Sequence, residues 1–598
     1  MIGYGSRTAS CAPTALLDSI RARLFAVDLA APGLDRHVAL VSLLLSAGEL
    51  AQGLADRAFE ERGYDGGDPA ADLAMVLAVA LARQVWRSHA TGYGHQARIA
   101  EARAALWRLG RITRDDPVHI RSAEGFQHYG VYPETFAAAA AALGGHAPAL
   151  IVGIRTIGTT LAAAVAGVFS RRKAPLTVRP IGHPFDRQLA LGVEATRALA
   201  LARRLVAVVD EGPGLSGSSF GSVLDALAEA GVPETSVRLF PSHLTLGARA
   251  SERTRTRWAR LARHCVPFEA ELLASGQTGL VAWTEDLTGR QTSPPEDIGA
   301  GLWRAHLFGA RSRWPPVSAT RERRKYLLRA EGGRFLARFG GLASAGEACH
   351  SRARLLAEAG FSPPILGLRH GFLVHPWMEG ARPLSDDPSR IARRELLARV
   401  ADYLTFRGLN FPAGANRGAR PHELLAMTTA NAGEALGHEP PRRLEARFVP
   451  WLDELAREAR PVEVDARLHA WEWLVLPDGR LLKTDAVDHC EGHDPIGCQD
   501  PTWDLAGAVV ELELDPMETE WMRRRVRTQA TPVEPEQLGF YLACYLGFQL
   551  GLHHLGWQAS TDPGERALLQ AAAARYARRL DVVCQASTNQ GASITTTP

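Results

Sequence analysis

Two adjacent acids, Asp210 and Glu211, follow an aliphatic run and precede a loop of glycines and serines over residues 212–219. Small residues let backbone N–H groups converge, and the N-terminus of a following helix adds partial positive charge, so such a loop can hold a phosphate. The acids would repel a pyrophosphate, whereas they suit ribose hydroxyls or a magnesium-bound sugar. The pattern therefore predicts a sugar-phosphate site, with the phosphate held by Gly214, Ser216, Gly217, Ser218 and Ser219.

The same loop also matches a dinucleotide-binding fingerprint, because Gly212, Gly214 and Gly217 have the spacing GxGxxG. A dinucleotide site needs an acid near the end of the next strand, where it meets a ribose hydroxyl. The next strand, expected over 236–240, is followed by Pro241 and carries no acid at its end. An acidic turn that caps a helix is the simplest alternative. The acid pair, the serine-rich loop and the buried strand together favour the sugar-phosphate interpretation.

An earlier segment, PALIVGIRTIGTTLAAAVA over residues 148–166, has the pattern of a strand, a loop and a helix. Gly153 and Gly158 leave room for the backbone, and their spacing is that of a Walker A loop. Thr159 stands where that loop requires a lysine, so no cation would reach the outer phosphates of a nucleotide. We therefore reject a Walker A loop here.

Together these two segments, about a third of the chain, resemble the type I phosphoribosyltransferases. In that family two acids hold the ribose hydroxyls of phosphoribosyl pyrophosphate (PRPP) and small residues hold its 5′-phosphate, which implies these roles for Asp210, Glu211 and the loop 216–219. The loop is one residue longer than usual if both acids form the pair; alternatively, Glu211 alone is in register. The resemblance also implies that Arg155, with Gly158 beside it, holds the pyrophosphate and, with Mg²⁺, stabilises the leaving charge.

The stretch VRPIGHPFDRQL, over residues 178–189, lies between the two segments and offers several charged groups. The mobile hood of the family, which closes over the substrate, occupies this part of the chain order. His183 and Arg187 are the substrate-binding candidates that the resemblance implies. A surface loop with stray charges explains the stretch equally well.

A second set of chemically able residues lies in DARLHAWEWLVLPDGRLLKTDAVD, over residues 465–488, which reads as a loop and a hairpin with Asp478-Gly479 at its turn. With QDPTWDLAGA, which follows, it resembles the catalytic loop, hairpin and buttress of the aminoglycoside-phosphotransferase branch of the protein-kinase fold. That resemblance implies an ATP–Mg²⁺ site in which Asp485 is a metal ligand and Glu472 replaces the asparagine ligand.

The second resemblance has departures at the positions that do chemistry. Arg338 stands where the ATP-binding lysine is expected, with Glu347 as its candidate partner. Arg467 falls where the catalytic acid is expected, and Asp465 and His469 are the nearby groups that could replace it. A working kinase and a kinase-like domain that has lost or changed its activity both stay open. The His, Cys and Asp residues over 488–498 match no trusted zinc spacing, and a polar activation-type segment is favoured.

The elements that must position these residues predict an α/β fold. Residues 1–110 read as helices and 111–316 as alternating strands and helices, so a parallel sheet covered on both faces is expected. Residues 317–587 are expected to form the kinase-like α+β domain, after a Pro- and Arg-rich linker over 311–326. The last residues, 588–598, are expected to be a disordered tail.

Composition limits the class of protein. A net charge of +3, with 46% hydrophobic and 22% charged residues, gives no sign of a nucleic-acid or membrane partner. Seven cysteines without a CxxC pair fit a reducing cytosol. We expect a cytoplasmic, Mg²⁺-dependent phosphoribosyltransferase-type enzyme that acts on PRPP or a phosphoribosyl compound, coupled to an ATP-binding, kinase-like domain with a second phosphotransferase activity. The alternative is a PRPP or nucleotide sensor with a catalytically weak kinase-like domain.

Overall fold

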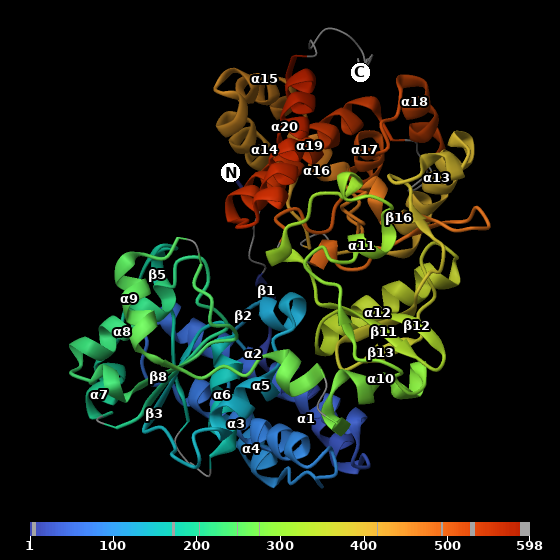
Figure 1. Ribbon diagram of the computed structural model, residues 1–598. Coiled ribbons are helices and arrows are strands. Elements are labelled where there is room, and N and C mark those ends of the chain that lie inside the picture. The colour runs from blue at the N-terminus through green and yellow to red at the C-terminus, as the bar shows by residue number, and fades with distance from the viewer. Residues whose placement is uncertain are drawn as a thin grey trace.

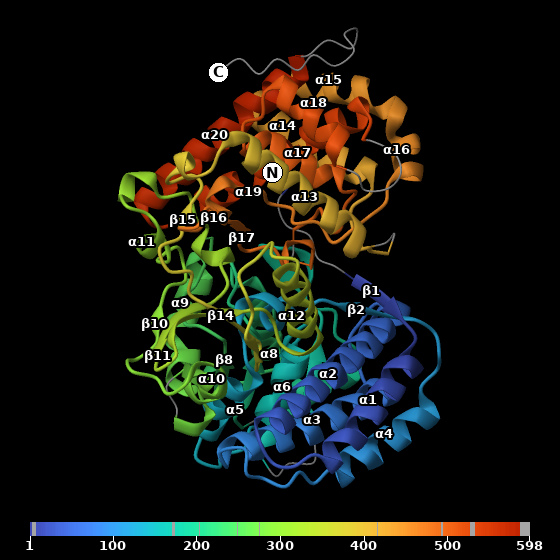
Figure 2. The ribbon, with the colours of Figure 1, turned by 90° about the vertical axis from the view of Figure 1, so that its right-hand side faces the viewer.

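The computed structural model (Figure 1) describes residues 1–2, 8–169, 174–202, 204–247, 249–273, 276–414, 417–491, 494–526 and 533–585. The fold is mixed α/β, with one parallel and several antiparallel sheets. The N-terminal helices lie between the parallel sheet and a five-stranded antiparallel sheet, and a helical lobe lies at the other end of the molecule (Figures 1 and 2). The predicted tail, 588–598, falls outside the described residues.

The N-terminal part is helical, with a small two-stranded antiparallel sheet, β1–β2 (Thr8–Cys11 and Val118–Arg121), beside it. Its helices are α1 Pro13–Leu29, α2 Leu34–Arg62, α3 Pro69–Ala90 and α4 Ala100–Ile112. The Asp68 side chain caps α3 by accepting hydrogen bonds from the first free backbone N–H groups. Helices α2 and α3 are long and apolar enough to span a membrane, but 67% and 56% of their apolar windows are buried within the fold.

A parallel sheet with the order β4-β3-β7-β8-β9 follows, which confirms the predicted alternation. Alternate residues of β7 point to opposite faces: Ala207 and Val209 join the core shared with the N-terminal helices, and Val206 and Val208 join a second core. The strands are β3 Leu150–Ile154, β4 Leu176–Val178, β7 Val206–Val209, β8 Val237–Phe240 and β9 Ala262–Arg263. Both faces are therefore covered, as continuous apolar strands require.

The covering helices are α6 Gly158–Val168 on one face and α8 Ser218–Glu229 on the other, with α7 Val193–Leu201 and α9 Glu252–Arg260 at the second core. Helix α6 is buried under α2, and a Cβ on Gly48 would lie only 1.9 Å from Thr160 Oγ1. Because strand order reverses between β3 and β7, the loops after these two strands diverge at a topological switch point, where such sheets bind ligands.

The antiparallel sheet has the order β10-β11-β12-β14-β13 and carries α12 Ala343–Glu358 beside it. Side-chain alternation along β12 places Ala337 and Phe339 in the core with the N-terminal helices, while Leu336 and Arg338 face the opposite side. The strands are β10 Glu296–Asp297, β11 Lys325–Ala330, β12 Gly333–Phe339, β13 Gly367–Arg369 and β14 Phe372–Pro376. The core that this sheet shares with the N-terminal helices contains residues from both sides of the predicted domain boundary at 316–317. The predicted domain boundaries stay predictions.

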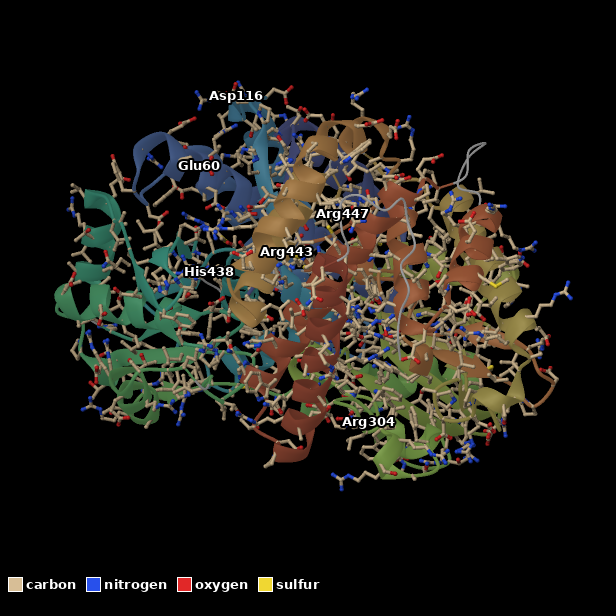
Figure 3. The ribbon with its side chains drawn as sticks, turned by 90° about the horizontal axis from the view of Figure 1, so that it is seen from above. Glu60, Asp116, Arg304, His438, Arg443 and Arg447 are labelled. Atoms are coloured by element: carbon tan, nitrogen blue, oxygen red, sulfur yellow. The ribbon has the colours of Figure 1, made fainter. Side chains whose placement is uncertain are left out.

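The helical lobe surrounds a three-stranded sheet, β15-β16-β17, in which Asp478 and Gly479 lie at the predicted hairpin turn. The strands are β15 Arg382–Pro383, β16 Trp473–Val475 and β17 Leu481–Lys483. The helices are α13 Arg393–Asn410, α14 Pro421–Leu436, α15 Glu439–Phe448, α16 Leu452–Glu458, α17 Thr502–Glu511, α18 Pro516–Arg525, α19 Pro535–Ala559 and α20 Pro563–Gln585. Arg304, labelled in Figure 3, precedes the predicted linker and pairs with Glu565 of α20, at 2.8 Å.

Candidate functional site

Asp210 and Glu211 lie at the carboxyl end of β7, on one side of the switch point, and the loop after β3 lies on the other. The two loops approach closely, because a Cβ on Gly158 would lie 2.7 Å from the Val209 carbonyl oxygen. A Cβ on Gly125 would lie 2.8 Å from the Glu211 carboxyl carbon. At Gly158 the neighbour is backbone, so only glycine fits there, whereas at Gly125 the Ile157 and Glu211 side chains would have to move.

Within the described part of the chain, Asp210 and Glu211 form no ion pair that compensates their charge. Burial raises the pKa of Asp210 to about 7, and burial together with the neighbouring Asp210 charge raises the pKa of Glu211 to about 8. Burial also raises the pKa of Glu124 to about 7, against the pull of Arg321. A desolvated carboxylate cluster of this kind gains free energy from a bound cation or from hydroxyl donors.

The serine-rich loop adopts the geometry expected of a turn into a helix, with Gly214 and Gly217 at positive φ of 61° and 68° before α8. The Ser216 and Ser218 hydroxyls both donate to the Pro184 carbonyl oxygen, at 3.1 and 2.7 Å. Pro184 lies at the tip of the β5–β6 hairpin, Ile181–His183 and Asp186–Gln188. The predicted hood therefore rests on the phosphate loop, and Ser219 lies beside it at the start of α8, half-buried.

The predicted hood residues contact the hairpin itself. His183 Nδ1 accepts a hydrogen bond from the Phe185 backbone at 3.2 Å, and Arg187 Nη1 donates to the Gly182 carbonyl at 2.7 Å. His183 is exposed and Arg187 is half-buried. The hood and the role of both residues in binding stay predictions.

Arg155 differs from the prediction that it holds a pyrophosphate. Its guanidinium is buried, with Nε 2.9 Å from Asp56 Oδ1 and Nη2 paired with Asp65, and its Nη1 donates to Thr177. Arg179 pairs with the same Asp56. The acidic partners of Arg155, Asp56 and Asp65, come from α2 and from the turn before α3, at least ninety residues earlier in the chain. These ion pairs hold the parallel sheet to the N-terminal helices. Arg155 is therefore a structural ion-pair residue in this structure.

The second site is a cleft of about 300 Å³ between the antiparallel sheet and the helical lobe. Its walls come from the sheet face of β12, the end of β14, the loop 465–472 and the segment after β17. Residues 298–325 form a further wall, so the predicted linker lies along the cleft. The elements carry the predicted residues in the predicted order, with Arg338 on a strand and Asp485 after a hairpin.

Arg338 enters the cleft from β12 and pairs with Asp485 and with Asp488, the latter at 2.8 Å. Asp488 also pairs with Arg323 from the linker. Although burial opposes it, Arg338 and His489 hold the pKa of Asp485 well below its usual range. Asp485, Asp488 and His489 bring one ligand atom each within 4.8 Å of one another. The predicted metal aspartate therefore lies in a cluster of donors that a guanidinium neutralises.

Lys483 was missed by the sequence analysis and lies at the centre of the cleft floor. It is fully buried, with Nζ 2.8 Å from Glu472 Oε2 and 3.2 Å from Asp465 Oδ2. Glu472 is therefore neutralised by Lys483, in place of the predicted partnership with Asp485 around a metal. The signal was present, because Lys483 and Asp485 are two residues apart at the end of one strand.

Asp465 differs from its prediction as the acceptor-orienting acid, because it is 1% exposed and already has partners. Tyr403 donates to its carboxylate, and Asp504 accepts from its backbone N–H at 2.8 Å. Burial would raise the pKa of Asp465, but Lys483 and His489 lower it to about 2. The role of Asp504 as buttress of the loop agrees with the resemblance. Asp465 holds the loop together and does not face an acceptor.

The expected place of the catalytic acid holds Arg467, which lines the cleft and pairs with Asp494. His489 lies between the two acids of the site, with Nδ1 2.9 Å from the Asp465 carbonyl oxygen and Nε2 3.7 Å from Asp485 Oδ2. Burial and Arg467 lower its pKa, yet the hydrogen bonds to the acids outweigh them and raise it to about 9. The cleft is therefore rich in cations at neutral pH.

Glu347 lies outside the cleft, contrary to its predicted pairing with Arg338. It is exposed on α12, whereas Cys349 and Arg352 are buried on the face turned to the site. The Arg352 Nε–H donates to the Val487 carbonyl at 2.6 Å. A helix turns by about 100° per residue, so a register error of two positions moves a side chain to the other face. In the cluster 488–498, Cys490 and Cys498 are buried, and His493 lies outside the described residues.

A short helical segment, Gly125–Tyr129, lies between the two sites. Its first residue abuts the Glu211 carboxylate. Its later residues accept from Arg323, whose Nη1 donates to the Gln127 carbonyl and whose Nη2 lies 2.6 Å from His128 Nδ1. Arg323 in turn pairs with Asp488 in the cleft. The two sites therefore share this wall.

No protein-family model matches the chain, and no curated protein does. Among solved structures, it is similar to the choline kinase LicA from Streptococcus pneumoniae, with 16% identity over 43% of this chain and 89% of that one, at a TM-score of 0.30. A choline/ethanolamine kinase family protein from Mesorhizobium loti has 19% identity over 53% of this chain and 93% of that one, at a TM-score of 0.32. A Plasmodium vivax ethanolamine kinase has 8% identity over 56% of this chain and 97% of that one, at a TM-score of 0.29. At such identities and TM-scores the likeness says nothing about what this chain binds or does.

Proposed function

We propose that the cleft between the antiparallel sheet and the helical lobe binds a nucleoside triphosphate with Mg²⁺, as in kinase-like phosphotransferases. The observation that carries this proposal is the meeting of Arg338 from the sheet with Asp485 and Asp488 from the segment after the hairpin. Phosphoryl transfer needs a cation on the phosphates and oxygen ligands for the metal, and these residues supply both. Mg²⁺ would take the place of the guanidinium on Asp485 and free Arg338 for the phosphates.

The acceptor side of the cleft differs from a kinase that acts on an alcohol. An alcohol acceptor needs a nearby base to take its proton, and Arg467 occupies the place expected for that acid, while Asp465 is buried. A phosphate or carboxylate acceptor is already ionised and needs no base, and Arg467 suits its charge. We therefore expect firm nucleotide binding, slow ATP hydrolysis and slow transfer to alcohols.

Calorimetric titration of the full chain with ATP, with and without Mg²⁺, tests nucleotide binding in the cleft. Asp485→Asn should weaken Mg²⁺-dependent binding at least tenfold, because a metal ligand is lost. Asp478→Asn is the matched control, since Asp478 is an exposed acid on the adjoining hairpin turn. Equal binding by both variants, or no binding by the wild type, would contradict the assignment.

A second candidate function is binding or transfer of a phosphoribosyl group at the edge of the parallel sheet. The observation that favours it is the position of Asp210 and Glu211 at the switch point, beside a serine-rich loop under the β5–β6 hairpin. Mg²⁺ and ribose hydroxyls would compensate the burial that raises the pKa of both acids. PRPP is the ligand that the sequence resemblance implies.

PRPP titration in the presence of Mg²⁺ tests binding at the edge of the parallel sheet. Asp210→Asn with Glu211→Gln should abolish metal-dependent binding, whereas Glu229→Gln, an exposed acid on the adjacent helix α8, should not. Pyrophosphate release from PRPP with candidate acceptors would indicate a transferase. Binding without release would instead support the alternative of a PRPP sensor.

A further inference from the structure

Three buried side chains from separate elements meet where the N-terminal helices pack on the antiparallel sheet. They are His37 on α2, Glu134 on α5 (Pro133–Ala141) and His370 in the turn between β13 and β14. Their exposed fractions are 0%, 0% and 3%. None of the three lines the cleft or belongs to the loops of the first site. The cluster therefore needs an explanation of its own.

The ligand atoms converge on one point. His37 Nε2 lies 2.9 Å and His370 Nε2 lies 2.7 Å from Glu134 Oε1. The second carboxylate oxygen, Glu134 Oε2, is buried and has no hydrogen-bond partner in the described part of the chain, and neither has His37 Nδ1. Burial of such groups without partners costs about 1–3 kcal/mol each, and native structures rarely leave them so.

We propose that this cluster is a binding site for a divalent transition-metal ion of the Zn²⁺ class, held by His37, Glu134 and His370. Two imidazoles and a carboxylate are a donor set that zinc uses, whereas Mg²⁺ and Ca²⁺ prefer oxygen ligands alone. Bonds of about 2.0–2.1 Å place tetrahedral ligand atoms roughly 3.3 Å apart. The observed separations need to open by only about half an ångström, and the metal could also engage Glu134 Oε2, the carboxylate oxygen that has no partner in the described part of the chain.

The surroundings favour a structural ion. The His37 ring lies 4.6 Å from that of Tyr93, and the His370 ring lies 4.8 Å from that of Trp283, centroid to centroid. The Tyr93 hydroxyl accepts from Trp283 Nε1 at 2.8 Å and donates to the Thr278 carbonyl at 3.0 Å, so it is already satisfied. Because aromatic rings exclude water and the ligands come from three elements, the ion would fasten the N-terminal helices to the antiparallel sheet.

Metal content of the full chain, without an affinity tag and expressed with added Zn²⁺, provides the first test. Mass spectrometry should find about one zinc per chain in the wild type and in His89→Asn, a buried histidine nearby that pairs with Glu271 instead. Glu134→Gln keeps the shape of the side chain and should lower zinc affinity at least about tenfold. The loss of a residue that only orients a metal ligand already costs that much, and Glu134 would bind the metal itself. Asp488→Asn, in the other donor cluster, should keep its zinc.

A second measurement covers variants that fail to fold. Wild-type protein is unfolded in urea and refolded with Zn²⁺, with Co²⁺ or with a chelator. Zinc should raise the melting temperature above that of the chelator sample, and cobalt should give the visible absorption of a tetrahedral nitrogen and oxygen site. Refolding to equal stability with no bound metal would overturn the proposal. Retention of zinc by Glu134→Gln together with His370→Ala would do the same, because the metal would then lie elsewhere.

Discussion

Buried carboxylates have opposite electrostatic environments at the edge of the parallel sheet and in the cleft between the antiparallel sheet and the helical lobe. At the edge, Asp210 and Glu211 form no ion pair within the described residues, and their pKa values rise. In the cleft, Asp465, Asp485 and Asp488 have basic partners, as Lys483 is for Asp465, and their pKa values fall. The first site is left with charge that a ligand can neutralise. In the cleft the acids are already neutralised by basic side chains of the protein, so a ligand that binds these acids must displace those cations.

The comparison predicts the largest loss of stability for Lys483→Met. The change leaves Asp465 and Glu472 buried without their shared cation, which should lower the free energy of unfolding by about 3–5 kcal/mol. Arg480→Met, on the exposed part of the same hairpin, is the matched control. Urea unfolding followed by intrinsic fluorescence measures both. A loss below 1 kcal/mol for Lys483→Met would show that the cleft acids do not depend on it.

Arg155→Ala should have the next largest effect, because Arg155 pairs with Asp56 and Asp65 beneath the first sheet. We expect a loss of about 2–3 kcal/mol, below the full cost of a broken buried pair, since Arg179 still pairs with Asp56. Affinities for PRPP and ribose 5-phosphate should fall by similar factors in calorimetry. A selective loss for PRPP would return Arg155 to a pyrophosphate-binding role.

Asp210→Asn with Glu211→Gln should change stability in the opposite direction. Both pKa values are raised in the folded protein, so the folded state binds protons more tightly than the unfolded chain. Their contribution to stability is therefore full below about pH 4 and is lost as pH rises through 7–8. The double variant should be more stable by about 1–3 kcal/mol at pH 8 and should lack this slope. A less stable variant at pH 8 would break the contrast between the sites.

Arg187→Ala should have the smallest effect, about 0.5–1 kcal/mol, because it removes one hydrogen bond to the Gly182 carbonyl at the surface. Thermal unfolding measures this loss. The same variant sharpens the assignment of the hairpin, since a fall in PRPP affinity without a matching loss of stability would show that the hood touches the ligand. Unchanged affinity would place Arg187 in the hairpin alone.

Local pattern predicted the elements of both sites but not their electrostatic partners. The strand before Asp210, the helix after Gly217 and the hairpin at Gly479 follow from apolar runs, glycines and turn residues, all of which act within a few positions. The pairing of Arg155 with Asp56 joins residues about a hundred positions apart. It depends on how α2 packs against the sheet, which no local pattern specifies.

The remaining differences between the predicted and the observed cleft concern which face of an element a side chain occupies and which distant residues contact it. The resemblance placed Glu347 opposite Arg338, but the buried face of α12 presents Cys349 and Arg352, so the acid turns outward. Lys483 could have been noticed, because it is the last residue of the strand that leads into Asp485, which was already assigned. The burial of Asp465 could not, because it follows from Tyr403 and Asp504, which come from α13 and α17.

The segment Gly125–Tyr129 connects the two sites physically, and ligands bound at both would be coupled to the extent that they move it. The segment Gly125–Tyr129 abuts Glu211 at one end and accepts from Arg323 at the other. A ligand that shifts Gly125 thus also shifts the acceptors that hold Arg323 against Asp488. Any factor by which it changes affinity in the cleft must reappear, equal in size, when the order of addition is reversed, since linkage between two binding equilibria is reciprocal.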